Sequence, residues 1–308
     1  MTAASTAIPS RRFARRALRH WGERLIEGVL FLAALSAVAV TVAIVAILLY
    51  ESAAFFEHVP LKDFLTDTQW TIMFADKHFG VLPLLAGTLT TTGVALALAI
   101  PVGTVAAIYL SEFAGHRTRE IVKPTLELLA GIPTVVYGYF ALLMVTPALQ
   151  WFMPDLPGFN MLGPGLVMGI MIIPYVSSVA EDAMRAVPMH MREGSYAMGA
   201  TRLQTALKVV APAATSGIVA AYILGISRAV GETMVVAVAA GQQPNFTFDP
   251  RESGATITAF IVQVALGDLP HGSLEYQSIF AVGLVLVLLT LFFNVLGHLV
   301  RKRFREAY

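Results

Sequence analysis

The sequence predicts an all-α membrane protein, built as a six-helix transmembrane bundle. Of its 308 residues, 56% are hydrophobic and only 13% are charged, and the mean hydropathy is +0.71. A typical soluble domain carries about 25% charged residues, so this composition argues against a soluble enzyme. Six apolar runs account for the excess, and each is close to the roughly 20 residues that a helix needs to cross the hydrocarbon.

The first run, 26–50, is charged only at Glu27. It is longer than the apolar core of a signal peptide, so we expect it to remain as a first transmembrane helix. The other five runs are 81–110, 126–152, 162–180, 213–240 and 279–300. Residues 81–300 are therefore expected to form the main transmembrane domain. Within it, the spacing of Gly165 and Gly169 predicts close approach of a second helix.

The distribution of lysine and arginine predicts the orientation. Seventeen of the 21 basic residues lie in a basic tail at 1–25, in loops at 111–125 and 181–208, and in the tail at 301–308. Because lysine and arginine accumulate on the cytoplasmic side, both termini are predicted to be cytoplasmic. The segments 51–80 and 241–278 are then periplasmic. Within the second, Thr256–Gly267 is too short to span and should form a helix at the interface or dip into the bundle.

Several kinds of chemistry find no support in the sequence. There are no cysteines, which excludes disulfides and thiolate metal sites. No lysine follows a glycine, so no Walker A loop exists, and neither an H-E-x-x-H nor a G-x-S-x-G motif occurs. A net charge of +1 does not favour nucleic-acid binding. We therefore expect no catalytic residue, metal or cofactor on this chain, and an intramembrane enzyme lacks a motif.

The loop at 181–212 carries the clearest local pattern. Pro188 suits the start of a short helix, and Gly199 suits the position just after its end. Thr201 with Gln204 forms a capping-box pattern for a second helix. This helix–turn–helix could bind a partner protein, or it could be a solvated segment on the membrane surface.

The same loop contains Glu193, Gly194 and Ser195, then Gly199, and further on Val209 and Pro212. This pattern resembles the EAA loop of ABC importer permeases, with Gly194 and Ser195 in place of the two alanines. In that family the short helix docks into a cytoplasmic ATPase subunit and transmits its nucleotide-driven closure. The resemblance implies that ATP and Mg²⁺ are bound by the partner. It also implies that coupling to the ATPase depends on Glu193, Gly194, Ser195, Gly199 and Pro212.

Three further segments, 79–88, 127–138 and 227–234, resemble the permeases of phosphate-specific (Pst) importers, more closely PstC than PstA. The resemblance covers about residues 79–300. It implies a type I ABC importer permease (MetI-like) fold and inorganic phosphate as cargo. The implied partners are a PstA-type permease, a PstB-type ATPase dimer and a PstS-type phosphate-binding protein, with lipid around the chain and no nucleic acid.

Arg228 and Glu232 lie inside an otherwise apolar run. A charge there costs roughly 2.5–3.5 kcal/mol, and the i, i+4 spacing predicts one helix face and an ion pair. The pair could simply lock two helices together, or it could form part of a translocation pathway. Arginine suits an oxyanion because its guanidinium stays charged and can bind two oxygens. The Pst resemblance implies that both residues contribute to phosphate passage.

Two alternative functions remain from the sequence. The same type of importer could carry sulfate, molybdate or phosphonate, since no substrate ligand is established. An ion-coupled secondary transporter could use Arg228 and Glu232 as a proton or anion relay, although such proteins typically show paired broken helices or repeats, neither of which is visible in this sequence. Only the ABC alternative requires a separate ATPase chain.

Overall fold

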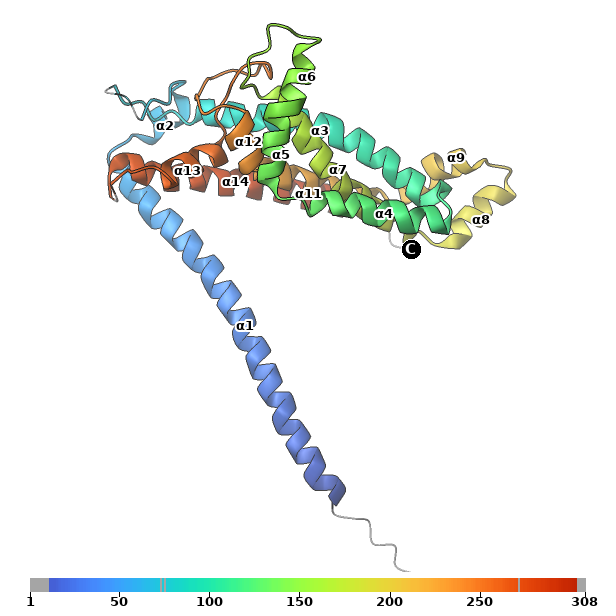
Figure 1. Ribbon diagram of the computed structural model, residues 1–308. Helices are drawn as coiled ribbons and strands as arrows, with labels where there is room; N and C mark the ends of the chain where they lie inside the picture. The colour runs from blue at the N-terminus through green and yellow to red at the C-terminus, as the bar shows by residue number, and fades with distance from the viewer. Residues whose placement is uncertain (1–10, 73, 75, 271, 304–308) are drawn as a thin grey trace, which may run out of the picture. The chain divides into compact units, whose positions relative to one another are not determined.

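The computed structural model describes residues 11–72, 74, 76–270 and 272–303 (Figure 1). Over these residues every regular element is helical, apart from one isolated β-bridge between Trp70 and Phe79. The chain divides into two compact units, which are Met1–Tyr50 and Glu51–Tyr308. Positions 1–10 of the predicted basic tail and 304–308 of the second tail lie outside the described residues.

The first unit is formed by α1 (Arg11–Phe56), whose last residues belong to the second unit. The helix is longer than the predicted run at 26–50, because the arginines, alanines and leucines before it are strong helix formers. Its part from Glu23 is long and apolar enough to cross a membrane. A helix that is apolar on all sides is typical of a membrane span, so the predicted first span is confirmed as a helix.

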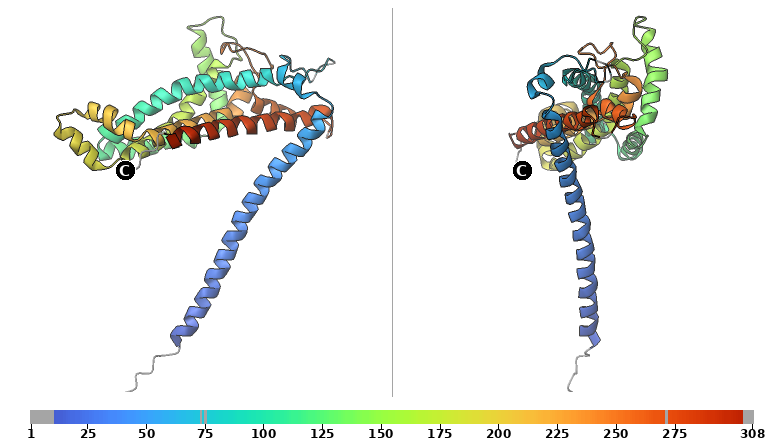
Figure 2. Two further views of the ribbon diagram at one scale, coloured as in Figure 1. Left: turned by 180° about the vertical axis from the view of Figure 1, so that it is seen from behind. Right: turned by 90° about the vertical axis from the view of Figure 1, so that its left-hand side faces the viewer.

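Four long helices form the centre of the second unit. They are α3 (Leu82–Ile108), α7 (Leu162–Arg185), α11 (Thr215–Val230) and α14 (Leu274–Arg303). The helices α3 and α7 lie side by side, and α11 packs against both and against α14 (Figures 1 and 2). A Cβ at Gly169 would lie 2.8 Å from the Ala95 carbonyl oxygen, which confirms the close approach predicted there.

Two of the predicted spans are bent rather than straight. The run at 126–152 is divided between α4 (His116–Ala130) and the segment that begins with α5 (Thr134–Phe140) and ends with α6 (Thr146–Gln150), at an angle of 86°. Pro133 cannot donate a backbone hydrogen bond and disfavours helix at the residue before it, which explains the break. A second bend of 75° at Ala214 separates α9 (Arg202–Thr205) and α10 (Ala211–Ala213) from α11. The described residues thus hold four candidate spans, or six if each bent pair counts as one.

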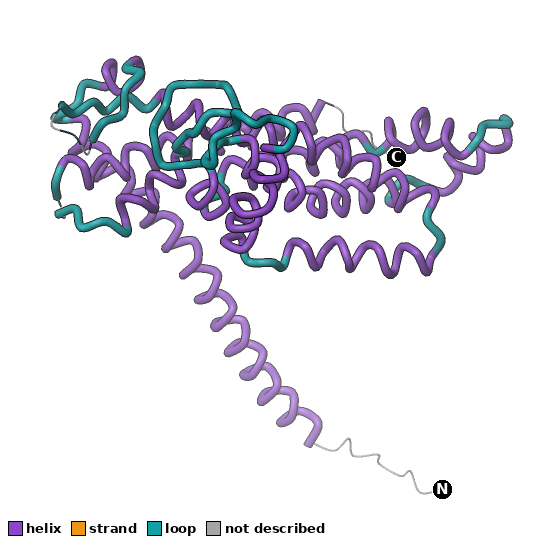
Figure 3. Tube along the Cα trace, turned by 45° about the horizontal axis from the view of Figure 1, so that its top comes forward, coloured by secondary structure: helices purple, strands orange, loops and turns teal. Residues whose placement is uncertain are grey.

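The two ends of the second unit differ. One end, here the α2 end, carries α2 (Leu61–Thr66), α13 (Ile257–Ala265) and many of the loops (Figures 1 and 3). The other end, here the α8 end, carries α8 (Met189–Ala197) and α9. Among the described residues, three π-helical segments adjoin α-helices: η1 (Tyr109–Phe113) follows α3, η2 (Ala141–Val145) joins α5 to α6, and η3 (Ala206–Val210) joins α9 to α10. Such turns occur frequently at functional sites.

A buried aromatic cluster holds the α2 end together. The ring of Trp70 meets that of Phe260 on α13 edge-to-face, with 4.9 Å between the centroids. Thr256 caps α13 by accepting the backbone N–H of Ala259, and the first half of this helix is buried. The helix expected within Thr256–Gly267 is therefore present and packs into the bundle.

Candidate functional site

The helix–turn–helix predicted at 181–212 is confirmed in its local geometry. The short helix α8 starts directly after Pro188 and is followed by Gly199, whose φ of +81° is the left-handed conformation that glycine adopts without strain. The Thr201 hydroxyl accepts the backbone N–H of Gln204 at 3.3 Å, and the Gln204 side chain accepts the Thr201 backbone N–H at 2.9 Å. Both halves of the capping box are therefore formed.

The predicted coupling residues fall into two places. Glu193, Gly194 and Gly199 are exposed, while the Ser195 hydroxyl lies 2.8 Å from the Thr205 hydroxyl and ties α8 to α9. Pro212 lies apart from them on α10, directly before the bend at Ala214. The exposed apolar side chains around these residues are Met189, Tyr196, Met198, Leu203 and Leu207. The α8 end therefore presents a rigid helix with an acidic residue beside an apolar surface.

Arg192 is a residue that sequence analysis missed, although it directly precedes Glu193. Its side chain is only 10% exposed and binds both carboxylate oxygens of Glu112, at 2.8 and 3.2 Å. It also donates to the backbone carbonyls of Val187 and Met184. Glu112 is 80 positions away in the sequence, so no local spacing connects the two residues.

A second buried carboxylate was also missed. Glu181 on α7 is fully buried and accepts hydrogen bonds from Arg119 at 2.7 Å and Lys123 at 2.8 Å, both on α4. Arg185 contributes a looser ion pair at 3.7 Å, one helical turn along α7. These pairs hold the polar helix α4 against α7. Only the i, i+4 spacing of Glu181 and Arg185 was visible in the sequence.

The predicted ion pair between Arg228 and Glu232 is wrong. The helix α11 ends at Val230, and a new helix, α12 (Met234–Ala239), begins after a break, so the two charges do not share a helix face. Over the described residues no ion pair joins them. The continuous helix expected at 213–240 is therefore absent. Gly231, which weakens a helix interior by about 1 kcal/mol relative to alanine, lies at the break.

Each of the two charges has its own environment. Glu232 is buried, and its Oε1 accepts the backbone N–H groups of Met234 and Val235 at 3.2 and 3.4 Å, which caps α12. The Arg228 guanidinium lies over the Tyr175 ring, 4.6 Å from its centroid. Its buried Nε finds no hydrogen-bond partner in the described structure. Since a buried polar group normally has a partner, Arg228 is the residue here that could bind an anion.

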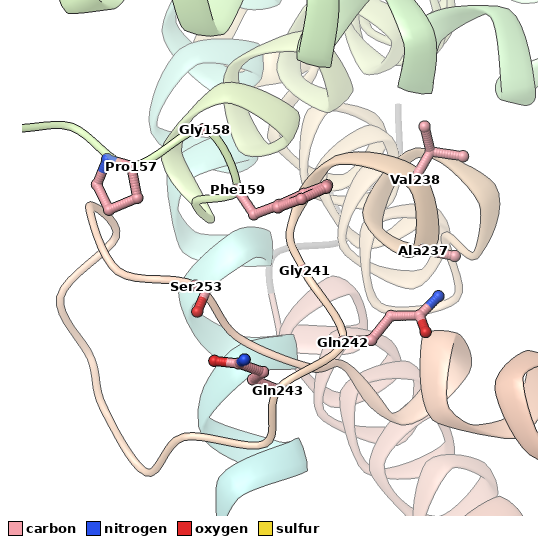
Figure 4. A pocket seen from close by; sticks show the side chains of 9 residues that line it. All are labelled: Pro157, Gly158, Phe159, Ala237, Val238, Gly241, Gln242, Gln243 and Ser253. Atoms are coloured by element: carbon pink, nitrogen blue, oxygen red, sulfur yellow. The ribbon is translucent and has the colours of Figure 1, made fainter.

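A cavity of about 650 Å³ opens at the far end of α12 from Glu232 (Figure 4). Figure 4 shows the side chains of Phe159, Gln242, Gln243 and Ser253 around it, and its lining holds no charged residue. The six residues of α12 span about 9 Å, so Glu232 and the cavity lie roughly that far apart along the helix. The lining can hydrogen-bond a polar solute but offers it no charge.

The family of the chain follows from residues 99–306, which match the binding-protein-dependent transport system inner membrane component. The chain is 36% identical over 234 residues to a probable ABC transporter permease, YqgH, of Bacillus subtilis, covering 76% of this chain and 75% of the relative. This chain belongs to the family of ABC transporter permeases.

Phosphate transport system permease proteins are among the relatives of this permease. PstC of Haemophilus influenzae is 31% identical, covering 79% of this chain and 82% of the relative. PstC 1 of Mycobacterium tuberculosis is 34% identical, covering 75% of each. The predicted membership of the PstC-type permeases is thereby confirmed.

Solved structures bear out the type I importer (MetI-like) fold. A bacterial ABC transporter involved in alginate import has a chain that matches with a TM-score of 0.63 at 15% identity, over 94% of this chain and all of the other. The MetNI methionine transporter matches with a TM-score of 0.54 at 19% identity, over 74% of this chain and 95% of the other. At these identities the likeness concerns the fold. The permease is a multi-pass membrane protein of a transport system.

Proposed function

We propose that this permease is the PstC-type subunit of an ATP-driven importer for inorganic phosphate and forms half of its translocation pathway. The observation that carries the proposal is the buried Nε of Arg228, which finds no hydrogen-bond partner among the described residues. PstC relatives at 31% and 34% identity support phosphate as the cargo. The absence of an ion pair between Arg228 and Glu232 in the described residues supports it further, because Glu232 does not neutralise the guanidinium.

In this proposal the α2 end is periplasmic, and the α8 end and both termini are cytoplasmic. The segments at 51–80 and 241–278 face a PstS-type binding protein, and the cavity of Figure 4 lies on the route towards Glu232 and Arg228. The second half of the pathway comes from a PstA-type permease. A PstB-type ATPase dimer binds ATP and Mg²⁺, docks on α8 beside Glu193, Gly194 and Ser195, and switches the bundle between inward- and outward-open states.

The decisive experiment measures uptake of labelled phosphate in phosphate-starved cells that contain the partner subunits. Arg228→Gln, at matched membrane levels, should lower uptake at least tenfold while the ATPase still co-purifies. Arg117→Gln is the matched control, because it removes the same charge from an exposed position on α4. Unchanged uptake in Arg228→Gln would reduce Arg228 to a structural residue.

Two other outcomes would redirect the proposal. If the unaltered chain assembles with its ATPase but carries no phosphate, sulfate, molybdate and phosphonate are tested in the same cells. If no ATPase co-purifies and uptake follows an ion gradient, the chain works as a secondary transporter instead.

A further inference from the structure

Arg192 makes more polar contacts than any neighbouring residue of α8. Its Nη2 donates to Glu112 Oε1 at 2.8 Å, and its Nε donates to Glu112 Oε2 at 3.2 Å. Its Nη1 donates to the Val187 carbonyl at 2.6 Å, and Nη2 also reaches the Met184 carbonyl at 2.8 Å. The guanidinium thus binds one carboxylate in the bidentate geometry that arginine favours, and two carbonyls besides.

The partners of Arg192 belong to different parts of the bundle. Glu112 lies in η1, which continues α3 directly, and Met184 lies in the last turn of α7. Since α3 and α7 pack along each other, one side chain fixes α8 to the ends of both central helices. The ion pair is nearly buried, at 10% and 4% side-chain exposure. Separating it would leave a buried charge without a partner, which is strongly unfavourable.

Adjacent residues of α8 face in opposite directions. Arg192 is buried against the bundle, whereas Glu193 and Gly194 are exposed. A second tie, between the hydroxyls of Ser195 and Thr205, joins α8 to α9. The helix therefore has an outer side that a partner can reach and an inner side attached to the bundle. A movement that a partner imposes on the outer side reaches the bundle only if the inner contacts hold α8 rigidly.

We propose that Arg192 is the positioning residue that couples movement of α8 to α3 and α7, by clamping Glu112 and the end of α7. The inference rests on the proposed function, since it assumes that an ATPase moves α8. Through the contacts of Arg192, the ATP-driven movement of the ATPase is transmitted from α8 to α3 and α7. Without it, α8 follows the ATPase while the central helices lag behind.

The test uses the full complex in proteoliposomes, with phosphate-loaded binding protein and ATP. The variants are Arg192→Met, which keeps the apolar stem, the near-isosteric Glu112→Gln, and the double variant. Each single change should lower the phosphate transported per ATP hydrolysed at least tenfold, with ATP hydrolysis retained within about twofold. The double variant should match the singles within twofold, because all three remove the same contact. Arg117→Met, an exposed position on α4, should leave the ratio unchanged.

A second readout does not depend on the cargo. Because the chain has no native cysteine, spin labels can be attached at Ala197→Cys near the end of α8 and Val105→Cys on α3, both exposed. The distance between them should stay narrowly distributed on ATP binding in the unaltered clamp, and broaden in Arg192→Met and Glu112→Gln. This result would support the clamp even if phosphate were the wrong cargo.

The proposal is overturned if Glu112→Gln keeps both the unaltered transport ratio and the narrow distance distribution. It is also overturned if Arg192→Met assembles and transports normally. If Arg192→Met fails to assemble, the transport ratio and the label distances of Glu112→Gln decide the test. A failure of the unaltered complex to move phosphate concerns the proposed function, and the label distances then test the clamp separately.

Discussion

His78 and Asp67 form a charged hydrogen bond that closes the loop between α2 and α3. The His78 Nδ1 lies 2.7 Å from Asp67 Oδ2, and the Thr71 hydroxyl accepts the His78 backbone N–H. The hydrogen bond to Asp67 raises the pKa of His78 above its ordinary value of 6.5. Burial raises the pKa of Asp67, but hydrogen bonds from His78 and Gln69 outweigh it and leave the pKa below 3.8.

These shifts predict how loop stability depends on pH. The raised pKa of His78 means that its contribution is complete below 6.5 and is lost as the pH rises through its folded pKa. Asp67 contributes above 3.8 and loses its effect as the pH falls through its own folded pKa. Amide hydrogen exchange at 67–72, corrected for intrinsic rates, should therefore be slowest between pH 3.8 and pH 6.5. The slowing should disappear in His78→Gln, while α7 stays unaffected; an unchanged profile would contradict the role of the pair.

At the scale of elements, the close approach of α3 and α7 depends on glycines, beside the large apolar side chains of α7 that are buried in the same core. Gly165 and Gly169 let the backbone of α7 approach Val94 and Ala95 on α3. Helix association in lipid relies on such packing, because lipid tails cover leucine as well as protein does. The short distance between the backbones of α3 and α7 therefore requires glycine at these two positions.

Gly169→Ala should destabilise this contact. The added methyl would lie 2.8 Å from the Ala95 carbonyl oxygen, so the backbones must separate. Overpacking of this kind costs about 1–3 kcal/mol and should lower the thermal midpoint of the detergent-purified chain by a few degrees. Gly93→Ala on α3 is the control, because its methyl meets nothing within 4 Å. Equal midpoints for the two variants would contradict the close packing.

At the scale of the whole molecule, function depends on surfaces that this chain presents to other chains. Glu193 is exposed on α8, next to the apolar surface around Met198. Glu193→Lys should keep the chain inserted but reverse the charge at the surface proposed to bind the ATPase. We expect at least a tenfold loss of phosphate uptake, with weakened ATPase co-purification. Glu120→Lys, an exposed change on α4, is the control; normal uptake and co-purification in Glu193→Lys would contradict the coupling role.

Much of the architecture was determined by composition and by short-range patterns in the sequence. Apolar runs longer than the hydrocarbon thickness require helices, which explains why α1, α3, α7 and α14 were all predicted. The capping box at Thr201 and the left-handed glycine at Gly199 were equally visible, because they depend on neighbours within a few residues. The orientation drawn from the basic residues and the domain boundaries drawn from the apolar runs stay predictions.

The arrangement of charges was decided only by the tertiary structure. Spacing placed Arg228 and Glu232 on one helix face. The break at Gly231 instead lets Glu232 accept backbone N–H groups from the first turn of α12 and leaves Arg228 against Tyr175. The pairing of Arg192 with Glu112 joins segments 80 residues apart. A buried charge takes whichever partner the packed helices bring within reach, and packing is a property of the whole fold.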